Sequence, residues 1–254
     1  MGWRIVRHSF ILLFRNFSNA LKVSIGPLLI GGALIVVALY VTGTSPQSIL
    51  LAPQSSEDAG AAALVVLFAL LVGLFVLSWV AVAWHRFILK EEYPGLMPML
   101  NSAHVLPYIG RSVVLALLMT LILLPVAAIA GIVLSALGLI NSALGGLVVG
   151  FAMGLFFTFV WLRVALVLPA RAINQPISIR EAWTLSIPAS SDILSASVIL
   201  VGLNFVVGAI LELFFGQSAI GLVVNLSVSW VTLMIGTSVL TTLYGHLVQG
   251  RPLP

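Results

Sequence analysis

The chain has 254 residues, of which 61% are hydrophobic and only 7% are charged, and its net charge is +4. Soluble domains carry about 25% charged residues, so this composition excludes a soluble enzyme, a DNA-binding domain and a disordered scaffold. Cysteine is absent, which excludes disulfides, thiolate metal ligands and thiol nucleophiles. We therefore expect an integral membrane protein.

The first 22 residues have the pattern of an amphipathic helix. Apolar and aromatic residues recur every three or four positions, and the other face carries Arg4, Arg7, Arg15 and Lys22. A basic face opposite an aromatic-rich apolar face is typical of a helix that lies in the lipid headgroup plane. We favour this interfacial interpretation over a cytoplasmic helix that packs on a helical bundle.

Six apolar runs follow, each close to the roughly 20 residues that a transmembrane helix needs. They cover residues 23–41, 60–84, 112–137, 144–168, 193–215 and 220–243. The sequence therefore predicts an all-α integral membrane protein with six transmembrane helices, in which residues 1–254 form a single polytopic domain.

The charged residues predict the orientation of these spans. All eleven basic residues lie on one side, whereas the connections near residues 42–59, 138–143 and 216–219 contain none. Basic residues concentrate on the cytoplasmic side of membrane proteins, so we expect both termini in the cytoplasm. The cytoplasmic side then carries eleven basic and four acidic residues, a net charge of +7, and the opposite side carries Glu57, Asp58 and Glu212.

An internal repeat is indicated by a second amphipathic unit at residues 176–183, before the fifth span. Its Ser178 and Glu181 have the spacing of a capping box, which starts a helix. A weaker copy occupies residues 97–108, before the third span. The even-numbered spans end in an aromatic residue, one other residue and a basic or potentially basic one: Trp84-His85-Arg86, Trp161-Leu162-Arg163 and Tyr244-Gly245-His246.

These features together predict three repeats of an interfacial helix followed by a transmembrane hairpin. The alternative is that the aromatic and basic residues are ordinary membrane anchors, which many unrelated proteins share. In either case, long basic side chains at the ends of spans reach toward the headgroups. The predicted headgroup and interface residues are Arg4, Arg7, Arg15, Lys22, Trp84, Arg86, Trp161, Arg163 and Arg180.

The layout of six spans with amphipathic inserts, and the segment of residues 168–183 (LPARAINQPISIREAW), resemble the YciC-like bacterial membrane proteins. They are also similar to the membrane domain attached to some bacterial glycerophosphodiester phosphodiesterases. The resemblance implies a helical bundle in the bacterial inner membrane. It carries over no catalytic residue, because the soluble phosphodiesterase domain of the fused members has no counterpart in this sequence.

Small residues at helical spacing predict two packing surfaces, because they let helix backbones approach closely in lipid. One surface is on the fourth span and the other on the sixth. Their members are Gly146, Gly150, Gly154, Ser229, Thr232 and Gly236.

Polar residues within the predicted spans support a second hypothesis. Asn204, Asn225 and Glu212 would line the path of a transporter or flippase for a small solute or lipid. No histidine has the spacing of a metal pair, and no phosphate-binding loop or nucleophile motif is present. We therefore expect no cofactor, no metal and no enzymatic activity.

The favoured hypothesis is a non-enzymatic accessory or scaffold protein of the bacterial cytoplasmic membrane. Its expected partners are anionic phospholipid, which the net charge of the cytoplasmic side attracts, and a membrane protein or a second copy of the chain. Nucleic acid is not expected, because the basic residues form no run.

Overall fold

The structure is a computed structural model that describes residues 2–45, 56–216 and 218–253, leaving aside the side chains of residues 56–58 and 219. All regular elements in these residues are helices, so the prediction of an all-α fold is confirmed. Most of the first connection predicted on the outer side, residues 46–55, lies outside the described residues, as do residue 217 and the side chains of Glu57 and Asp58.

Six helical stretches are long and apolar enough to cross a membrane, as predicted. Many of their large apolar side chains are exposed, among them Leu70, Leu121 and Leu222. Soluble proteins do not present apolar surface of this extent to water, so the chain is a polytopic membrane protein. The stretches are Phe17–Thr42, Ala59–Lys90, Ser102–Ala136, Ala143–Ala172, Ile179–Phe215 and Ile220–Leu247.

The chain divides into two compact units. Unit 1 comprises Met1–Asn16 and Gly110–Pro254, and unit 2 comprises Phe17–Ile109. The boundary falls inside helix α5 (Ser102–Ala136), whose first two turns belong to unit 2.

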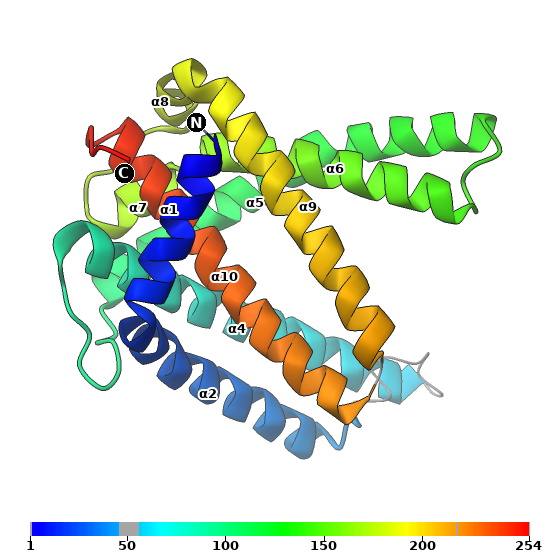
Figure 1. The fold of residues 1–254 in the computed structure, drawn as a ribbon. Helices are drawn as coiled ribbons and strands as arrows, with labels where there is room; N and C mark the ends of the chain where they lie inside the picture. The colour runs from blue at the N-terminus through cyan, green and yellow to red at the C-terminus, as the bar shows by residue number, and fades with distance from the viewer. Residues whose placement is uncertain (1, 46–55, 217, 254) are drawn as a thin grey trace. The chain divides into compact units, whose positions relative to one another are not determined.

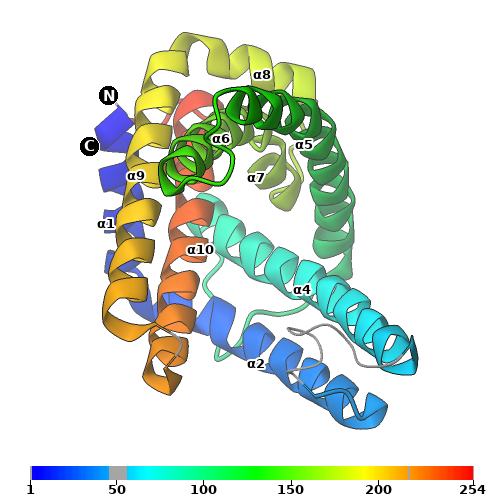
Figure 2. The same ribbon diagram turned by 90° about the vertical axis from the view of Figure 1, so that its right-hand side faces the viewer.

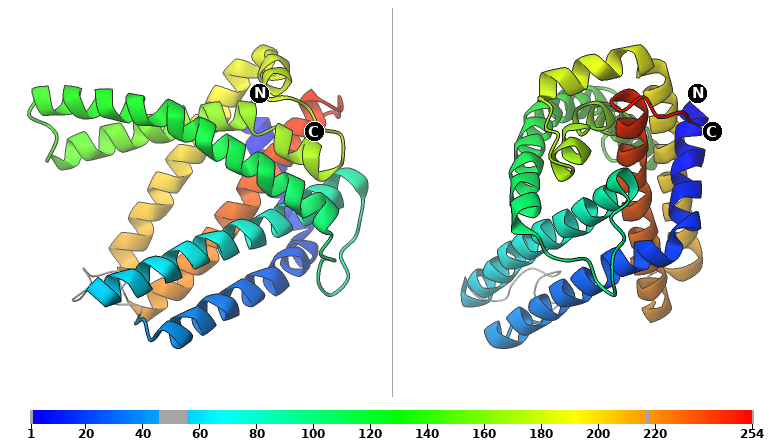
Figure 3. Two further views of the ribbon diagram at one scale, coloured as in Figure 1. Left: turned by 180° about the vertical axis from the view of Figure 1, so that it is seen from behind. Right: turned by 90° about the vertical axis from the view of Figure 1, so that its left-hand side faces the viewer.

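Unit 2 is built on a pair of helices, α2 (Phe17–Thr42) and α4 (Ser56–Lys90), which pack side by side as the blue and cyan helices of Figure 3. Gly31 allows their close approach, because a Cβ at this position would lie 2.9 Å from Cγ2 of Val76. A non-helical connection, residues 91–101, follows α4 and leads into α5.

The weaker amphipathic copy predicted at residues 97–108 is not a separate helix. Residues 97–101 are non-helical, and the remainder is the start of α5. The side chain of Asn101 sets this boundary, because its Oδ1 accepts a hydrogen bond from the N–H of Ala103 at 3.0 Å.

In unit 1, α1 (Gly2–Arg15) packs against α9 (Ser190–Phe215) and α10 (Ala219–Leu247), as Figure 1 shows. The buried face of α1 includes Ile5, Val6, Ser9 and Leu13. The hydroxyl of Ser9 adds a polar contact to this interface, donating to Oγ1 of Thr242 at 3.1 Å. The amphipathic face predicted for α1 therefore contacts protein over part of its width.

The predicted amphipathic helix of residues 1–22 is divided at Asn16. The side-chain amide of Asn16 donates to the carbonyl oxygen of Leu12 at 2.9 Å, which satisfies one of the free carbonyls at the end of α1. Residues 17–22 belong to α2 and hence to unit 2.

The turns of the two hairpins, α5 to α6 and α9 to α10, have the same construction. Ser142 precedes α6 (Ala143–Val164) and Ser218 precedes α10, and each serine Oγ accepts from the N–H of a glycine three residues on, at 2.9 and 3.0 Å. A glycine with positive φ ends the helix before each turn, Gly138 at 68° and Gly216 at 49°. Figure 2 shows the first of these hairpins, α5 with α6.

After α6 the chain forms α7 (Val167–Ala172), α8 (Ile179–Ser186) and a 3₁₀ turn (Ile187–Ala189). The predicted capping box at the start of α8 is confirmed. The N–H of Ser178 donates to Oε2 of Glu181 at 2.6 Å, and the N–H of Glu181 donates to Oγ of Ser178 at 3.1 Å. Residues 162–170 are buried without interruption, and α7 contacts α10, so part of the core of unit 1 lies here.

Candidate functional site

A cavity of about 560 Å³ lies within unit 2. Cavities of roughly 300–1,000 Å³ are typical of small-molecule sites. Its walls come from three segments: the charged end of α4, the connection of residues 91–101, and the first turn of α5. Val23 of α2 completes the lining.

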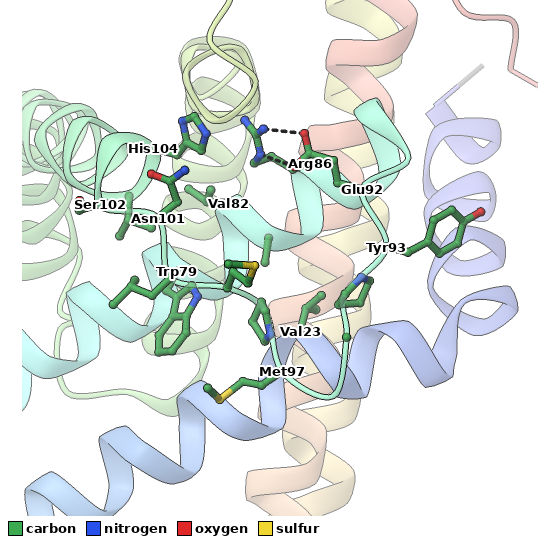
Figure 4. Close-up of a pocket in the computed structure, with 17 residues that line it drawn as sticks. Val23, Trp79, Val82, Arg86, Glu92, Tyr93, Met97, Asn101, Ser102 and His104 are labelled. Carbon is green, nitrogen blue, oxygen red and sulfur yellow. Dashed lines mark hydrogen bonds and ion pairs between the residues drawn. The ribbon is translucent and has the colours of Figure 1, made fainter.

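The polar end of the cavity contains an ion pair. The guanidinium of Arg86 donates from Nε and Nη2 to the two carboxylate oxygens of Glu92, at 2.7 and 2.5 Å. The Arg86 side chain is 15% exposed and that of Glu92 is 47% exposed, so the carboxylate faces outward. Figure 4 shows Asn101, which directly precedes α5, and His104, in the first turn of α5, near the same end.

The other end of the cavity is apolar. Val23 and Met97 line it together with the indole ring of Trp79, whereas Val82 lies nearer Asn101. The side chain of Met97 lies directly over Gly26 of α2, where a Cβ would be 2.7 Å from Cγ of the methionine. The connection is thereby held against α2.

Trp79 stands out because its polar atom is buried. The side chain is only 5% exposed, and its Nε1–H has no hydrogen-bond acceptor among the residues that the structure describes. A buried donor without an acceptor costs about 1–3 kcal/mol. The Trp79 side chain lines the cavity, but the N–H itself is shielded, so a bound molecule with an oxygen acceptor would satisfy it only after the side chains that cover it move aside.

A second polar pair in unit 2 is fully enclosed. Nε2 of His85 lies 3.4 Å from Oη of Tyr108, and the two ring centroids are 6.0 Å apart. Both side chains are buried. The pair joins α4 to the start of α5.

Arg163 in unit 1 ends the same three-residue pattern as Arg86 in unit 2, but its environment is different. Arg163 is only 6% exposed, and its Nε donates to Oγ of Ser186 at 3.0 Å. The guanidinium lies 3.8 Å from the ring centroid of Trp183 and 5.4 Å from that of Phe159. The positive charge is therefore held by aromatic rings and a hydroxyl, and no carboxylate of the described residues forms a salt bridge with it.

The predicted headgroup residues of α1 occupy two environments. Arg7 and Arg15 are exposed on the helix, beside Trp3 and Phe14, whose side chains are 60% and 55% exposed. Arg4 is also exposed, but its Nη2 donates to the carbonyl oxygen of Leu253.

The other predicted interface residues vary in exposure. Lys22 on α2 and Arg180 on α8 are exposed. Trp84 is fully buried, with its ring 5.6 Å from that of Phe87, whereas Trp161 is half-buried and stacks on Phe157.

The predicted packing residues of the fourth span lie partly between helices. α6 packs against α9 in unit 1, and a Cβ at Gly150 or Gly154 would lie 3.4 Å from a side-chain carbon of α9. A Cβ at Gly146 would have no such neighbour within 4 Å. On α10, the side chains of Ser229 and Thr232 are exposed.

The residues predicted for a polar path are also exposed. The amide of Asn204 donates to the carbonyl oxygen of Leu200 at 2.9 Å, and Oδ1 of Asn225 accepts from Oγ of Ser229 at 3.3 Å. Neither Asn residue nor Glu212 lines the unit 2 cavity or a smaller apolar cavity of about 330 Å³ between α5 and α6.

The histidines and acidic residues of the described ranges form no group of three that would hold a metal ion. His8 on α1 is partly buried, and desolvation lowers its pKa below the usual value.

No protein-family model matches the chain, and no curated protein or solved structure matches it either. The resemblance to the YciC-like proteins stays a prediction.

Sequence reasoning identified Arg86 and Arg163 but missed Trp79 and Trp183. Trp79 lies inside an apolar run that also contains Phe75 and Trp84, and nothing in this run indicates that its N–H is unpaired. Trp183 is in the segment that indicated the repeat, yet its contact with Arg163 joins residues from separate helices.

Proposed function

We propose that the chain is a non-enzymatic accessory protein of the bacterial inner membrane. In this proposal both termini are cytoplasmic, the basic side binds anionic phospholipid, and the membrane helices pack against a partner protein or a second copy of the chain. The asymmetric placement of all eleven basic residues supports the orientation.

The observation that carries the lipid proposal is the exposed edge of α1. One face of this helix packs against α9 and α10 through residues such as Val6 and Leu13, so that face is already occupied. Trp3 and Phe14 remain outside, on the same helix as the exposed Arg7 and Arg15. Exposed aromatic rings beside basic side chains suit the boundary between headgroups and acyl chains.

The exposed small residues of α10 support packing against a partner. Ser229, Thr232 and Gly236 are exposed, and a Cβ at Gly236 would meet no atom within 4 Å. A surface of this kind lets the backbone of another helix approach closely in lipid.

The threefold repeat is part of the same proposal. Two features support it: the serine-and-glycine turns that join α5 to α6 and α9 to α10, and the left-handed residues that follow α4 and α7. These residues are Glu91, with φ of 57°, and Asn174, with φ of 60°. Equivalent turns at equivalent places are expected of repeated units.

The lipid proposal is tested on the full chain purified in mild detergent. Each basic residue near an anionic surface contributes about 1 kcal/mol, so Arg7→Gln with Arg15→Gln should weaken retention of phosphatidylglycerol about 30-fold. Native mass spectrometry measures this retention. Arg4→Gln is the matched control, because the Arg4 guanidinium already donates to Leu253, and it should have a smaller effect.

Unchanged retention in the double variant would contradict the lipid proposal. Solute transfer by the purified chain alone in liposomes would instead favour the transporter hypothesis, and Asn204→Ala would then reduce the transfer rate.

A further inference from the structure

The unit 2 cavity has the lining of a site for an elongated amphiphile. Its polar end carries the Arg86–Glu92 ion pair, and its apolar end is formed by Val23, Met97 and the ring of Trp79 (Figure 4). Arg86 and Trp79 are seven positions apart on the same helix. At 1.5 Å per residue this separation is about 10 Å along the helix axis.

The unpaired indole N–H fixes one chemical requirement of the ligand. Trp79 is almost completely buried, and its Nε1–H has no acceptor in the described residues. The N–H is covered in this structure, so a ligand that moves the covering side chains aside is favoured if it brings an oxygen acceptor to the apolar part of the cavity. An ester carbonyl between a headgroup and an acyl chain is such an acceptor, because it lies several ångströms from the headgroup charges.

The ion pair indicates which headgroup charge the cavity favours. Arg86 and Glu92 compensate each other through two hydrogen bonds, so the polar end has no net charge from this pair. A purely anionic headgroup would be repelled by the exposed carboxylate of Glu92. A zwitterionic headgroup places its phosphate toward the guanidinium and its ammonium toward the carboxylate, so both charges are matched.

We propose that the cavity binds one zwitterionic phospholipid, with its headgroup at Arg86 and Glu92 and an ester carbonyl accepting from Nε1 of Trp79. The site is formed by other residues than the anionic-lipid surface of α1, and it binds another lipid class. The two proposals can therefore fail independently.

The test uses the full chain, delipidated in detergent and titrated with phosphatidylethanolamine while native mass spectrometry counts bound lipid. Trp79→Phe keeps an aromatic ring but removes the N–H, and should weaken binding of the first lipid about three- to tenfold. Trp3→Phe makes the same change on the exposed edge of α1 and should leave this affinity unchanged. Circular dichroism and thermal unfolding without lipid establish that each variant is folded.

A second variant, Glu92→Gln, tests the charge requirement. Glu92 lies at the exposed end of the cavity, so this test does not depend on whether the Trp79→Phe variant folds. The wild-type chain should bind phosphatidylethanolamine more tightly than phosphatidylglycerol at this site. Glu92→Gln should remove most of that preference, because the carboxylate that repels an anionic headgroup is lost.

Three results would overturn the proposal. The first is equal phosphatidylethanolamine affinity in the folded Trp79→Phe and Trp3→Phe variants. The second is equal affinity of the wild-type chain for the two lipids. The third is full competition by glycerophosphoethanolamine, which has the headgroup but no acyl chain and would identify a soluble ligand. Loss of phosphatidylglycerol retention in the Arg7 and Arg15 variant, with phosphatidylethanolamine binding intact, is expected if both proposals hold.

Discussion

The two units contain the same three-residue pattern and place it in opposite environments. In unit 2, Trp84 is fully buried and Arg86 forms an ion pair with Glu92 at the wall of a cavity. In unit 1, Trp161 is half-buried, whereas Arg163 is buried and stacks on aromatic rings. The tryptophan is thus the more buried of the two residues in unit 2, and the arginine is the more buried in unit 1.

The connection that follows each pattern explains the difference. After α6 and α7, the capping box begins α8 and this helix places Trp183 over the guanidinium of Arg163. After α4, Pro94 and Pro98 lie in a segment without helix, and Arg86 pairs with Glu92 of that segment. The same pattern at a span end therefore forms a filled core in one unit and a cavity wall in the other.

The largest expected difference between the units comes from removing the partner of each arginine. Trp183→Ala should lower the free energy of unfolding by about 2–3 kcal/mol, because it removes a large ring and leaves a buried cation without its stacking partner. Glu92→Gln should cost less than about 1 kcal/mol, since the carboxylate is partly exposed. Denaturant titration in detergent micelles measures both values.

Trp183→Phe is the control for this comparison, because it retains a ring over the guanidinium and should recover more than half of the loss. Equal destabilisation by Trp183→Ala and Glu92→Gln would show that the two arginines have equivalent environments.

Adding a methyl group at a helix contact should raise the stability of unit 1 and lower that of unit 2. Gly154→Ala in unit 1 should stabilise by about 0.5–1 kcal/mol, because alanine favours the helix and its Cβ would be at an ordinary distance, 3.4 Å, from Val201. Gly31→Ala in unit 2 should destabilise by about 1 kcal/mol, because its Cβ would be only 2.9 Å from Val76.

Gly146→Ala serves as the reference for this pair, since its Cβ would have no neighbour within 4 Å and only the helix preference should act. Thermal unfolding midpoints would rank the three variants. A stabilising Gly31→Ala would mean that α2 and α4 are packed more loosely than described.

The smallest expected difference between the units concerns Glu91, which follows α4, and Asn174, which follows α7, both in the left-handed conformation. Glu91 has φ of 57°, which is unfavourable for a residue with a long side chain, so Glu91→Gly should stabilise unit 2 by about 0.5–1 kcal/mol. Asn174 has φ of 60°, but asparagine tolerates this region, so Asn174→Gly should change stability less. Parallel thermal unfolding of the two variants tests the difference.

The membrane helices could be predicted because each is specified by its own composition. A run of about 20 apolar residues in lipid has to satisfy its backbone hydrogen bonds internally, and a local signal such as Ser178 with Glu181 specifies where a helix begins. Both kinds of signal lie within a short stretch of sequence and need no knowledge of tertiary contacts.

The cavity and the buried arginine could not be predicted, since they depend on which segments meet. Nothing in the run that contains Trp79 indicates that residues from the 91–101 connection will face it. The face of α1 gave the same pattern for lipid and for protein contact, because apolar burial does not depend on the identity of the apolar partner.

The packing of α1 against α9 and α10 has a consequence for biosynthesis. A ribosome completes α1 long before these helices exist, and at about 5–20 residues per second the delay until α10 is complete is roughly 12–46 s. During this interval Ile5, Val6 and Leu13 lack the surfaces of α9 and α10 that cover them in the folded chain, and we expect the bilayer surface to take their place. The order of synthesis thus predicts that lipid covers this face first and that α9 and α10 replace it later.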